Sequence, residues 1–177
     1  MSDEDRFDRL YQAHRPDLER FVRRRVSPAQ VEDVVAETFL VAWRRLDDLP
    51  TDPRPWLFGI ARNLMLRSVR STGRWHALQV RLAAEPRPAT EDLATEVATR
   101  TDLARAWAKL SVGEQEVLAL IGWDGLSAGE AATVLGCHVG TFRMRLLRAR
   151  RHLLHILDRL PPVEARPTRP VTNGALS

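Results

Sequence analysis

Residues 127–151, SAGEAATVLGCHVGTFRMRLLRARR, carry the strongest local structural signal in this 177-residue chain. Ser127 is a preferred residue type for the N-cap of a short helix, and Gly136 permits a tight turn after that helix. A second helix starts near Val139, and from Phe142 onward every third or fourth residue is apolar. Two helices joined by a glycine turn, the second with one buried face, predict a helix-turn-helix.

Arginine dominates the opposite face of that second helix. No Asp or Glu occurs between residues 131 and 157, so no acidic neighbour in this stretch neutralises the arginines. Helical arginines suit the major groove of duplex DNA, where they reach guanine edges and phosphates. The alternative is an ordinary helical hairpin with a solvated basic face, but the glycine turn and the acid-free window together favour DNA. The predicted duplex-contacting residues, here called the groove face, are Thr141, Arg143, Met144, Leu147, Arg148 and Arg151.

The overall charge is only weakly informative, because 27 basic and 23 acidic residues leave a formal net charge of +4. The distribution of the charges says more. A second acid-free window spans residues 53–84 and contains several arginines, among them Arg54 and Arg62. Two separated basic windows predict two surfaces that face a polyanion.

Composition excludes several classes of protein. The single cysteine, Cys137, cannot form an internal disulfide, and no uncharged apolar run approaches the roughly 20 residues of a membrane span. His152 and His155 are one helical turn apart without an evident third metal ligand. The sequence contains no phosphate-binding glycine loop and no nucleophile motif. We therefore expect a cytoplasmic protein that is not an enzyme and holds no metal or cofactor.

The predicted fold is all-α, because helical periodicity runs through the chain and no segment alternates convincingly as a strand does. Residues 75–96 are polar and rich in proline, which predicts a flexible linker. Residues 161–177 contain four prolines and little periodicity, which predicts a disordered tail. We expect two small helical domains, residues 1–74 and residues 97–160, the second ending in the helix-turn-helix.

The first domain contains three predicted helices. Pro16 should break or kink the first of them, since proline lacks the N–H that the helical ladder needs. Ser27 followed by Pro28 begins the second helix, which runs to about Leu46. The third helix begins at Pro53 after an Asp N-cap.

One stripe of the third helix combines an aromatic ring, an amide and two guanidinium groups. Single-stranded DNA is bound by such a set, because a ring stacks on a base while arginines hold phosphates. The alternative is that the tryptophan packs against the preceding loop and the arginines only improve solubility. The residues alone favour neither interpretation over the other. The residues of this single-strand stripe are Trp56, Asn63, Arg67 and Arg70.

The second helix has more apolar surface than one core-facing side requires. Beside its inward stripe runs a second stripe of mixed acidic and apolar residues, which indicates a protein-docking surface more than a DNA-binding one. The alternative is a helix buried on two sides within its own domain. The residues of this docking face are Asp33, Glu37, Leu40 and Arg44.

Three segments in this order resemble the extracytoplasmic-function subgroup (group 4) of bacterial RNA polymerase sigma factors, in the sigma-70 superfamily. The segments are EDVVAETFLVAWR at residues 32–44, PWLFGIARN at residues 55–63 and VGTFRMRL at residues 139–146. The resemblance covers about residues 7–160, interrupted by the linker. One such segment would be suggestive, whereas three in the right order and spacing make a strong match.

The resemblance implies a function and partners for each surface. Residues 1–74 would be a sigma region 2 domain, whose docking face binds core RNA polymerase. Its single-strand stripe and the loop at residues 47–52 would open the minus-ten promoter element and hold the non-template strand. Residues 97–160 would be a sigma region 4 domain whose groove face reads the minus-thirty-five element as duplex DNA. Many members of the family are held inactive by an anti-sigma factor, but no residue here identifies one.

Two positions depart from the family's pattern. Arg67 stands where members commonly carry Asp or Asn, which reverses the charge beside the expected base pocket, so minus-ten specificity cannot be carried over. Ala36 stands where Gln is usual, and we expect polymerase docking to tolerate it. Two rival functions are a stand-alone DNA-binding regulator, which needs neither the docking face nor the single-strand stripe, and a helical adaptor, which does not need the basic groove face.

Overall fold

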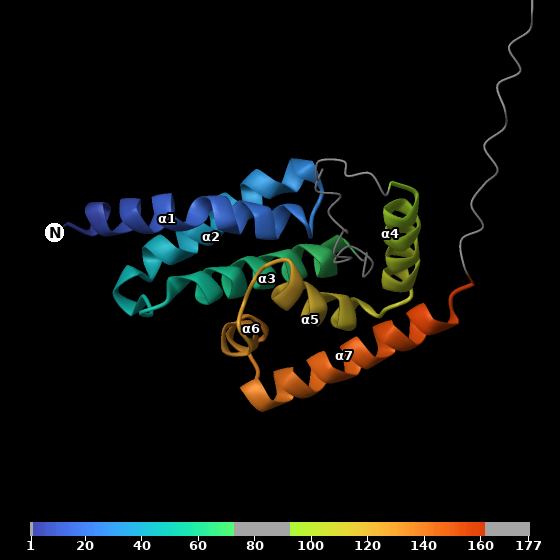
Figure 1. Cartoon of the computed structure of the whole chain (residues 1–177). Coiled ribbons are helices and arrows are strands. Elements are labelled where there is room, and N and C mark those ends of the chain that lie inside the picture. The colour runs from blue at the N-terminus through green and yellow to red at the C-terminus, as the bar shows by residue number, and fades with distance from the viewer. Residues whose placement is uncertain (1, 73–92, 162–177) are drawn as a thin grey trace, which may run out of the picture.

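The computed structural model describes residues 2–72 and 93–161 of the chain, and regular structure within these ranges is entirely helical (Figure 1). The prediction of an all-α fold is therefore confirmed. The predicted tail and most of the predicted linker lie outside the described residues. The elements in chain order are α1 (Asp3–Arg23), α2 (Pro28–Arg44), the 3-10 turn η1 (Leu46–Asp48), α3 (Pro53–Thr72), α4 (Leu93–Ala108), α5 (Val112–Gly122), α6 (Ala128–Leu135) and α7 (Val139–Arg159).

Helices α1 to α3 pack together and form the N-terminal half of the described chain, residues 2–72. The expected start of the second helix is confirmed, because Ser27 and Gln30 form a capping box at the first turn of α2. The expectation at Pro16 that the first helix breaks is wrong, since α1 is continuous through this residue. Pro16 lies on the exposed side, and the buried residues Leu18 and Phe21 of the following turn hold the helix against the core.

Helices α4 to α7 form the C-terminal half, residues 93–161, and contain the predicted helix-turn-helix. Ser127 caps α6 by accepting a hydrogen bond from the Glu130 amide, and Gly136 ends this helix with φ +62°. That left-handed conformation strongly favours glycine, so the turn before α7 is fixed by one residue. The His138 ring then accepts a hydrogen bond from the Gly140 amide at 3.1 Å and caps α7.

The two halves share one apolar core. Helix α3 lies between α1 and α2 on one side and α6 on the other, and α7 runs along the outside of α5 and α6 (Figure 1). The buried cluster extends from Phe21 and Phe58 in the N-terminal half to Leu120 and Phe142 in the C-terminal half. A second, smaller cluster around Trp107 holds α4 against α5 and α7. Sequence periodicity predicted the helices of each half but not this packing between the halves.

Within residues 2–72 and 93–161, no helix combines the length and apolar character needed to cross a membrane.

Candidate nucleic-acid and polymerase interfaces

The groove face lies on the outer side of α7. Phe142, Leu146 and Ala149 of this helix are buried against α5 and α6, which turns the opposite side of α7 to solvent. All six predicted groove-face residues are exposed, and Met144 keeps 51% of its surface accessible. The structure therefore brings the six together on one accessible face of α7.

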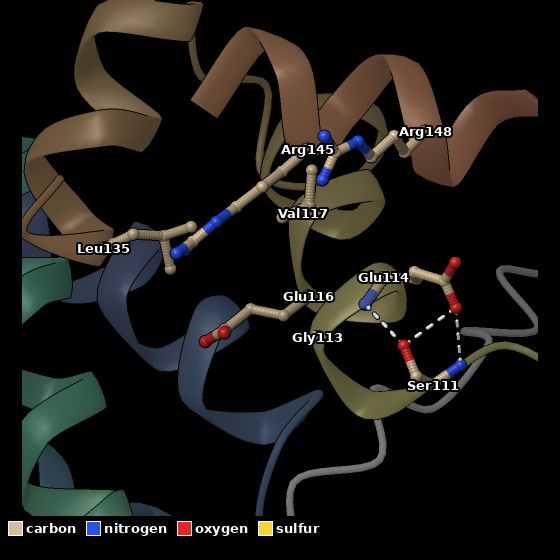
Figure 2. Close-up of a pocket in the computed structure, with 8 residues that line it drawn as sticks. All are labelled: Ser111, Gly113, Glu114, Glu116, Val117, Leu135, Arg145 and Arg148. Atoms are coloured by element: carbon tan, nitrogen blue, oxygen red, sulfur yellow. Dashed lines mark hydrogen bonds between the residues drawn. The ribbon is translucent and has the colours of Figure 1, made fainter. Parts of the chain in front are cut away.

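Part of this basic surface borders a hollow between α7 and the start of α5. Figure 2 shows Arg145 and Arg148 reaching from α7 across this hollow, Arg145 toward Leu135 and Arg148 toward Val117. Its far side carries Glu114, which caps α5 through Ser111. The basic surface of α7 therefore ends, on the side that faces α5, at the Glu114 carboxylate.

The Glu114 carboxylate belongs to the protein's own hydrogen bonding. Burial favours a raised pKa for Glu114, but hydrogen bonds from Ser111 and the contact with His152 together lower this pKa. His152 Nδ1 lies 2.8 Å from Glu114 Oε1. One of the two histidines considered as a metal pair thus interacts with a helix-capping carboxylate.

The single-strand stripe on α3 is divided between core and surface. Asn63 and Arg67 are exposed, whereas Trp56 is half-buried and packs against the shared core. The Arg45 guanidinium lies 5.8 Å from the centroid of the Trp56 ring, so the segment before the helix also contacts this tryptophan. Trp56 thus packs within the protein, as the alternative interpretation expected, but the residue is not fully buried. Arg70 lies on α3, but its side chain is outside the described part of the structure.

The docking face lies on α2 and is exposed at all four positions, with Leu40 47% accessible. Val35, Thr38 and Phe39 on the other side of the helix are buried against α1 and α3. The alternative, that the second helix is buried on two sides within its own domain, does not hold, because the side of α2 that carries the docking face is exposed. Trp43 extends the exposed apolar surface beside Leu40 and packs edge-on against Phe7 at a centroid distance of 5.1 Å.

Two arginines of the acid-free window at residues 53–84 do not face a polyanion, which corrects the expectation from charge distribution. Arg62 donates two hydrogen bonds to the Glu116 carboxylate of α5, at 2.6 and 3.0 Å. Arg54 donates to the Asp17 carboxylate at 2.8 Å and to the backbone oxygen of Asp124 at 2.7 Å. Both side chains therefore help to hold the halves together, because Glu116 and the backbone oxygen of Asp124 belong to the C-terminal half.

Sequence reasoning missed a buried charge cluster between Asp124, Arg24 and Arg25. The Asp124 carboxylate accepts hydrogen bonds from Arg25 at 2.5 Å and from Arg24 at 3.0 Å. Arg25 is only 2% exposed, and its guanidinium also stacks on the Phe21 ring at 3.7 Å. The only local signal was the Asp-Gly pair at residues 124–125, which indicates a turn but not a partner.

Arg54 also determines the acidity of Asp17. Burial alone would raise the pKa of Asp17, but the hydrogen bond and charge of Arg54, together with the charge of Arg20, hold this pKa below its ordinary value of 3.8. The Asp17 carboxylate is therefore ionised at neutral pH and attracts Arg54 to the junction of the two halves.

The fold and these exposed faces define a class: a two-part helical protein with a helix-turn-helix whose basic face is exposed and a separate helix, α2, that carries exposed apolar side chains. Comparison with family models matches residues 10–75 to sigma-70 region 2 and residues 100–153 to sigma-70 region 4. The chain belongs to the sigma-70 family of RNA polymerase sigma factors, in its extracytoplasmic-function group. It directs promoter-specific initiation of transcription as a partner of RNA polymerase.

Similar proteins cover most of the chain. The RNA polymerase sigma factor CnrH of Cupriavidus metallidurans is 38% identical over 148 residues, which span 75% of this chain and 76% of that protein. The extracytoplasmic-function sigma factor SigL of Mycobacterium tuberculosis is 33% identical over 156 residues, which span 85% of this chain and 88% of that protein. Among solved structures, the sigma factor RpoE in complex with the anti-sigma factor NepR from Bartonella quintana matches with a TM-score of 0.60 at 30% identity, covering 86% of this chain and 97% of that chain. CnrH in complex with the cytosolic domain of CnrY matches with a TM-score of 0.55 at 33% identity, and the match covers 86% of this chain and 87% of that chain.

Replacing Arg54 by Met should lower the free energy of unfolding at pH 7 by about 1–3 kcal/mol, because a hydrogen-bonded charge is lost from a partly buried site. Arg20→Met removes the exposed partner of the same carboxylate and should cost under about 1 kcal/mol. A carboxyl with a lowered pKa stabilises the fold above its unfolded pKa, and this contribution is lost as the pH falls through the folded pKa. In urea unfolding, the difference in the free energy of unfolding between the Arg54→Met and Arg20→Met variants should therefore be smaller at pH 3 than at pH 7. Equal losses of this free energy in the two variants at pH 7 would contradict the role given to Arg54.

Proposed function

We propose that three separate faces of this sigma factor divide the work of initiation. The docking face of α2 binds core RNA polymerase, the single-strand stripe of α3 holds the opened minus-ten strand, and the groove face of α7 reads the minus-thirty-five duplex. The observation that carries the proposal is that packing of α2, α3 and α7 leaves the predicted residues of α2 and α7, and Asn63 and Arg67 of α3, exposed, with Trp56 half-buried. The domain limits follow the two halves, residues 1–74 and residues 97–160.

The chemistry of α7 supports duplex reading. Arg143 and Arg148 carry planar guanidinium groups that can bind guanine O6 and N7 with two hydrogen bonds. Met144 and Leu147 add exposed apolar surface beside them, which suits contact with a thymine methyl group. The absence of acids from residues 131–157 keeps the potential of this helix positive, so phosphates are attracted to it.

The chemistry of α3 supports capture of unpaired bases. A partly accessible Trp56 ring can stack on a flipped or single-stranded base, and exposed Asn63 can hydrogen-bond to a base edge. Arg67 places a positive charge next to both, where a phosphate would be held. Stacking and phosphate contacts then compensate for the lost base pairs, so strand opening needs no covalent step by this chain. We accordingly propose a non-enzymatic, cytoplasmic role beside RNA polymerase.

An anti-sigma factor is a further proposed partner. The solved structures of RpoE and CnrH that this chain resembles are complexes with the anti-sigma factor NepR and with the cytosolic domain of CnrY. The exposed Leu40 and Trp43 side chains supply apolar area that such a partner could cover. Core polymerase and an anti-sigma factor would then compete for α2.

The first test of this proposal is binding to core polymerase. Leu40→Asp should weaken binding to purified core RNA polymerase by about tenfold or more, because a charge then replaces an apolar contact at the centre of the docking face. Ala13→Asp adds the same charge to an exposed site on α1 and should leave binding unchanged. Fluorescence anisotropy with labelled chain measures both. Failure of the unmodified chain to bind core polymerase would contradict the proposal and favour a stand-alone regulator or an adaptor.

A second test addresses the groove face. Arg148→Ala should weaken binding of the holoenzyme to a minus-thirty-five duplex by about 1–3 kcal/mol and relax the preference at one base pair. Arg159→Ala removes an equal charge at the far end of α7 and should produce a smaller loss that does not depend on sequence. Competition binding with duplexes that differ at one base pair of the minus-thirty-five element distinguishes a loss that depends on sequence from one that does not. Equal and sequence-independent losses would remove Arg148 from base reading.

A further inference from the structure

The connection between α2 and α3, residues 45–52, has an inner side that packs and an outer side that faces solvent. Leu46 starts the η1 turn and is only 5% exposed. The Asp48 amide donates a hydrogen bond to the backbone oxygen of Arg45 at 3.0 Å and closes the turn. The exposed polar side chains on the outer side include Asp47, Asp48 and Thr51. One ordered turn therefore presents polar groups to solvent directly before the single-strand stripe of α3.

Arg6 of α1 contacts this turn from a distant part of the sequence. Its guanidinium donates a hydrogen bond to the backbone oxygen of Leu46 at 3.1 Å and lies 3.6 Å from an oxygen of the Asp47 carboxylate. Figure 1 shows the connection between α2 and α3 at the same end of the helices as the start of α1. A charged donor makes a stronger hydrogen bond to a carbonyl than a neutral donor does. Arg6 therefore holds the turn by its backbone and by an acidic side chain.

Arg45, at the start of the same turn, extends these contacts to the ring of Trp56. The Arg45 Nε lies 3.8 Å from the Asp48 carboxylate, and the guanidinium carbon lies 5.8 Å from the centroid of the Trp56 ring. A cation at such a distance is attracted to the face of a tryptophan ring. A continuous series of contacts thus runs from Arg6 through the η1 turn to the ring that is proposed to stack on a base.

The two arginines also offset the negative charge of the turn. Asp47 and Asp48 would repel the phosphates of a DNA strand, but a guanidinium lies 3.6 Å from the first carboxylate and 3.8 Å from the second. Both carboxylates are exposed, so these pairs are weak in water and leave the oxygens accessible. A carboxylate can accept a hydrogen bond from an amino group on a base edge. The turn is therefore suited to contact a base more than a phosphate.

We propose that Arg6 is a positioning residue of the minus-ten site. It holds the η1 turn against α1, so that the polar side chains of the turn lie beside the base that stacks on Trp56, and it does not itself contact the strand. A turn that is ordered before binding loses less conformational entropy when the strand binds. This inference rests on the proposed function, because it needs a strand held on α3. Arg6 precedes residues 10–75, which match sigma-70 region 2, so the family match gives it no role.

The first measurement is hydrogen exchange of the free chain, read by mass spectrometry on peptides that cover residues 45–52. Arg6→Met removes the guanidinium and keeps an unbranched side chain. Exchange in these peptides should become about tenfold faster, because the turn loses its contact with α1. Arg23→Met is the matched control, since it removes an equal charge from the other end of α1, where Glu19 is the partner. The control should leave exchange in the turn unchanged.

The second measurement compares the base preferences of the holoenzyme. Single-stranded DNA with randomised positions is passed over immobilised holoenzyme, and sequencing of the retained strands gives the preference at each position. Arg6→Met should reduce the preference at one or two adjacent positions about fivefold, with the affinity for core polymerase unchanged. Arg6→Lys should recover part of this preference, because an ammonium group can still donate to the Leu46 oxygen. Arg23→Met should keep the full preference.

Circular dichroism establishes that each variant is folded. Unchanged exchange in the turn of Arg6→Met would overturn the inference. A loss of strand binding that is equal for every base would also overturn it, because Arg6 would then contact a phosphate directly. A joint loss of core binding and strand binding would do the same, since the role of Arg6 would then be generally structural. These outcomes leave the proposed function intact, whereas an unmodified holoenzyme that retains no more single-stranded DNA than core polymerase alone would contradict both.

Discussion

The contact of α3 with α6 is the constraint on which the rest of this structure depends. Helix α3 is packed on one side by α1 and α2 and on another by α6, so only a narrow part of its surface stays in solvent. Asn63 and Arg67 lie on that part, whereas Leu57 and Ala61 are fully buried. The same contact carries α7 on the outer side of α6, where its basic face is accessible. Packing thus decides which residues can meet DNA.

The acidic residues divide the many arginines into two groups. Arg25, Arg54 and Arg62 are paired with carboxylates of the chain, in partly or fully buried surroundings. Such pairs add little net stability, since desolvation offsets most of their attraction, but they specify one arrangement of the helices. The arginines of the groove face have no acidic neighbour in sequence between residues 131 and 157, and their side chains are exposed. Under the proposed function, a polyanion meets the second group and not the first.

Local signals in the sequence predicted local structure well. Ser127 and Gly136 define the limits of α6 through a capping box and a left-handed turn, both of which act within a few residues. The exposed stripes on α2 and α7 were predictable for the same reason, because helical periodicity separates the buried from the accessible side. The break expected at Pro16 was wrong because tertiary packing on the next turn overrides the loss of one hydrogen bond.

What the sequence could not predict depends on contacts between distant residues. Arg62 and Glu116 are 54 positions apart, and Arg25 and Asp124 are 99 apart, so no periodicity links them. For the same reason, Arg54 and Arg62 seemed available for DNA when only their acid-free neighbours were considered. Trp56 was ambiguous because its helix position allows both packing against the protein and stacking on a base, and the structure shows a half-buried residue that packs against the core.

The central claim is that the free chain is one folding unit with a core shared by both halves, and fluorine NMR of 5-fluorotryptophan during urea unfolding tests it most directly. The fifth tryptophan, Trp75, is replaced by Phe throughout. Trp43 and Trp56 then report on the N-terminal half, and Trp107 and Trp123 report on the C-terminal half, each assigned by replacement with Phe. A shared core predicts that all four signals lose their folded resonance at one urea concentration. Two separate midpoints, one for each pair of tryptophans, would contradict the account.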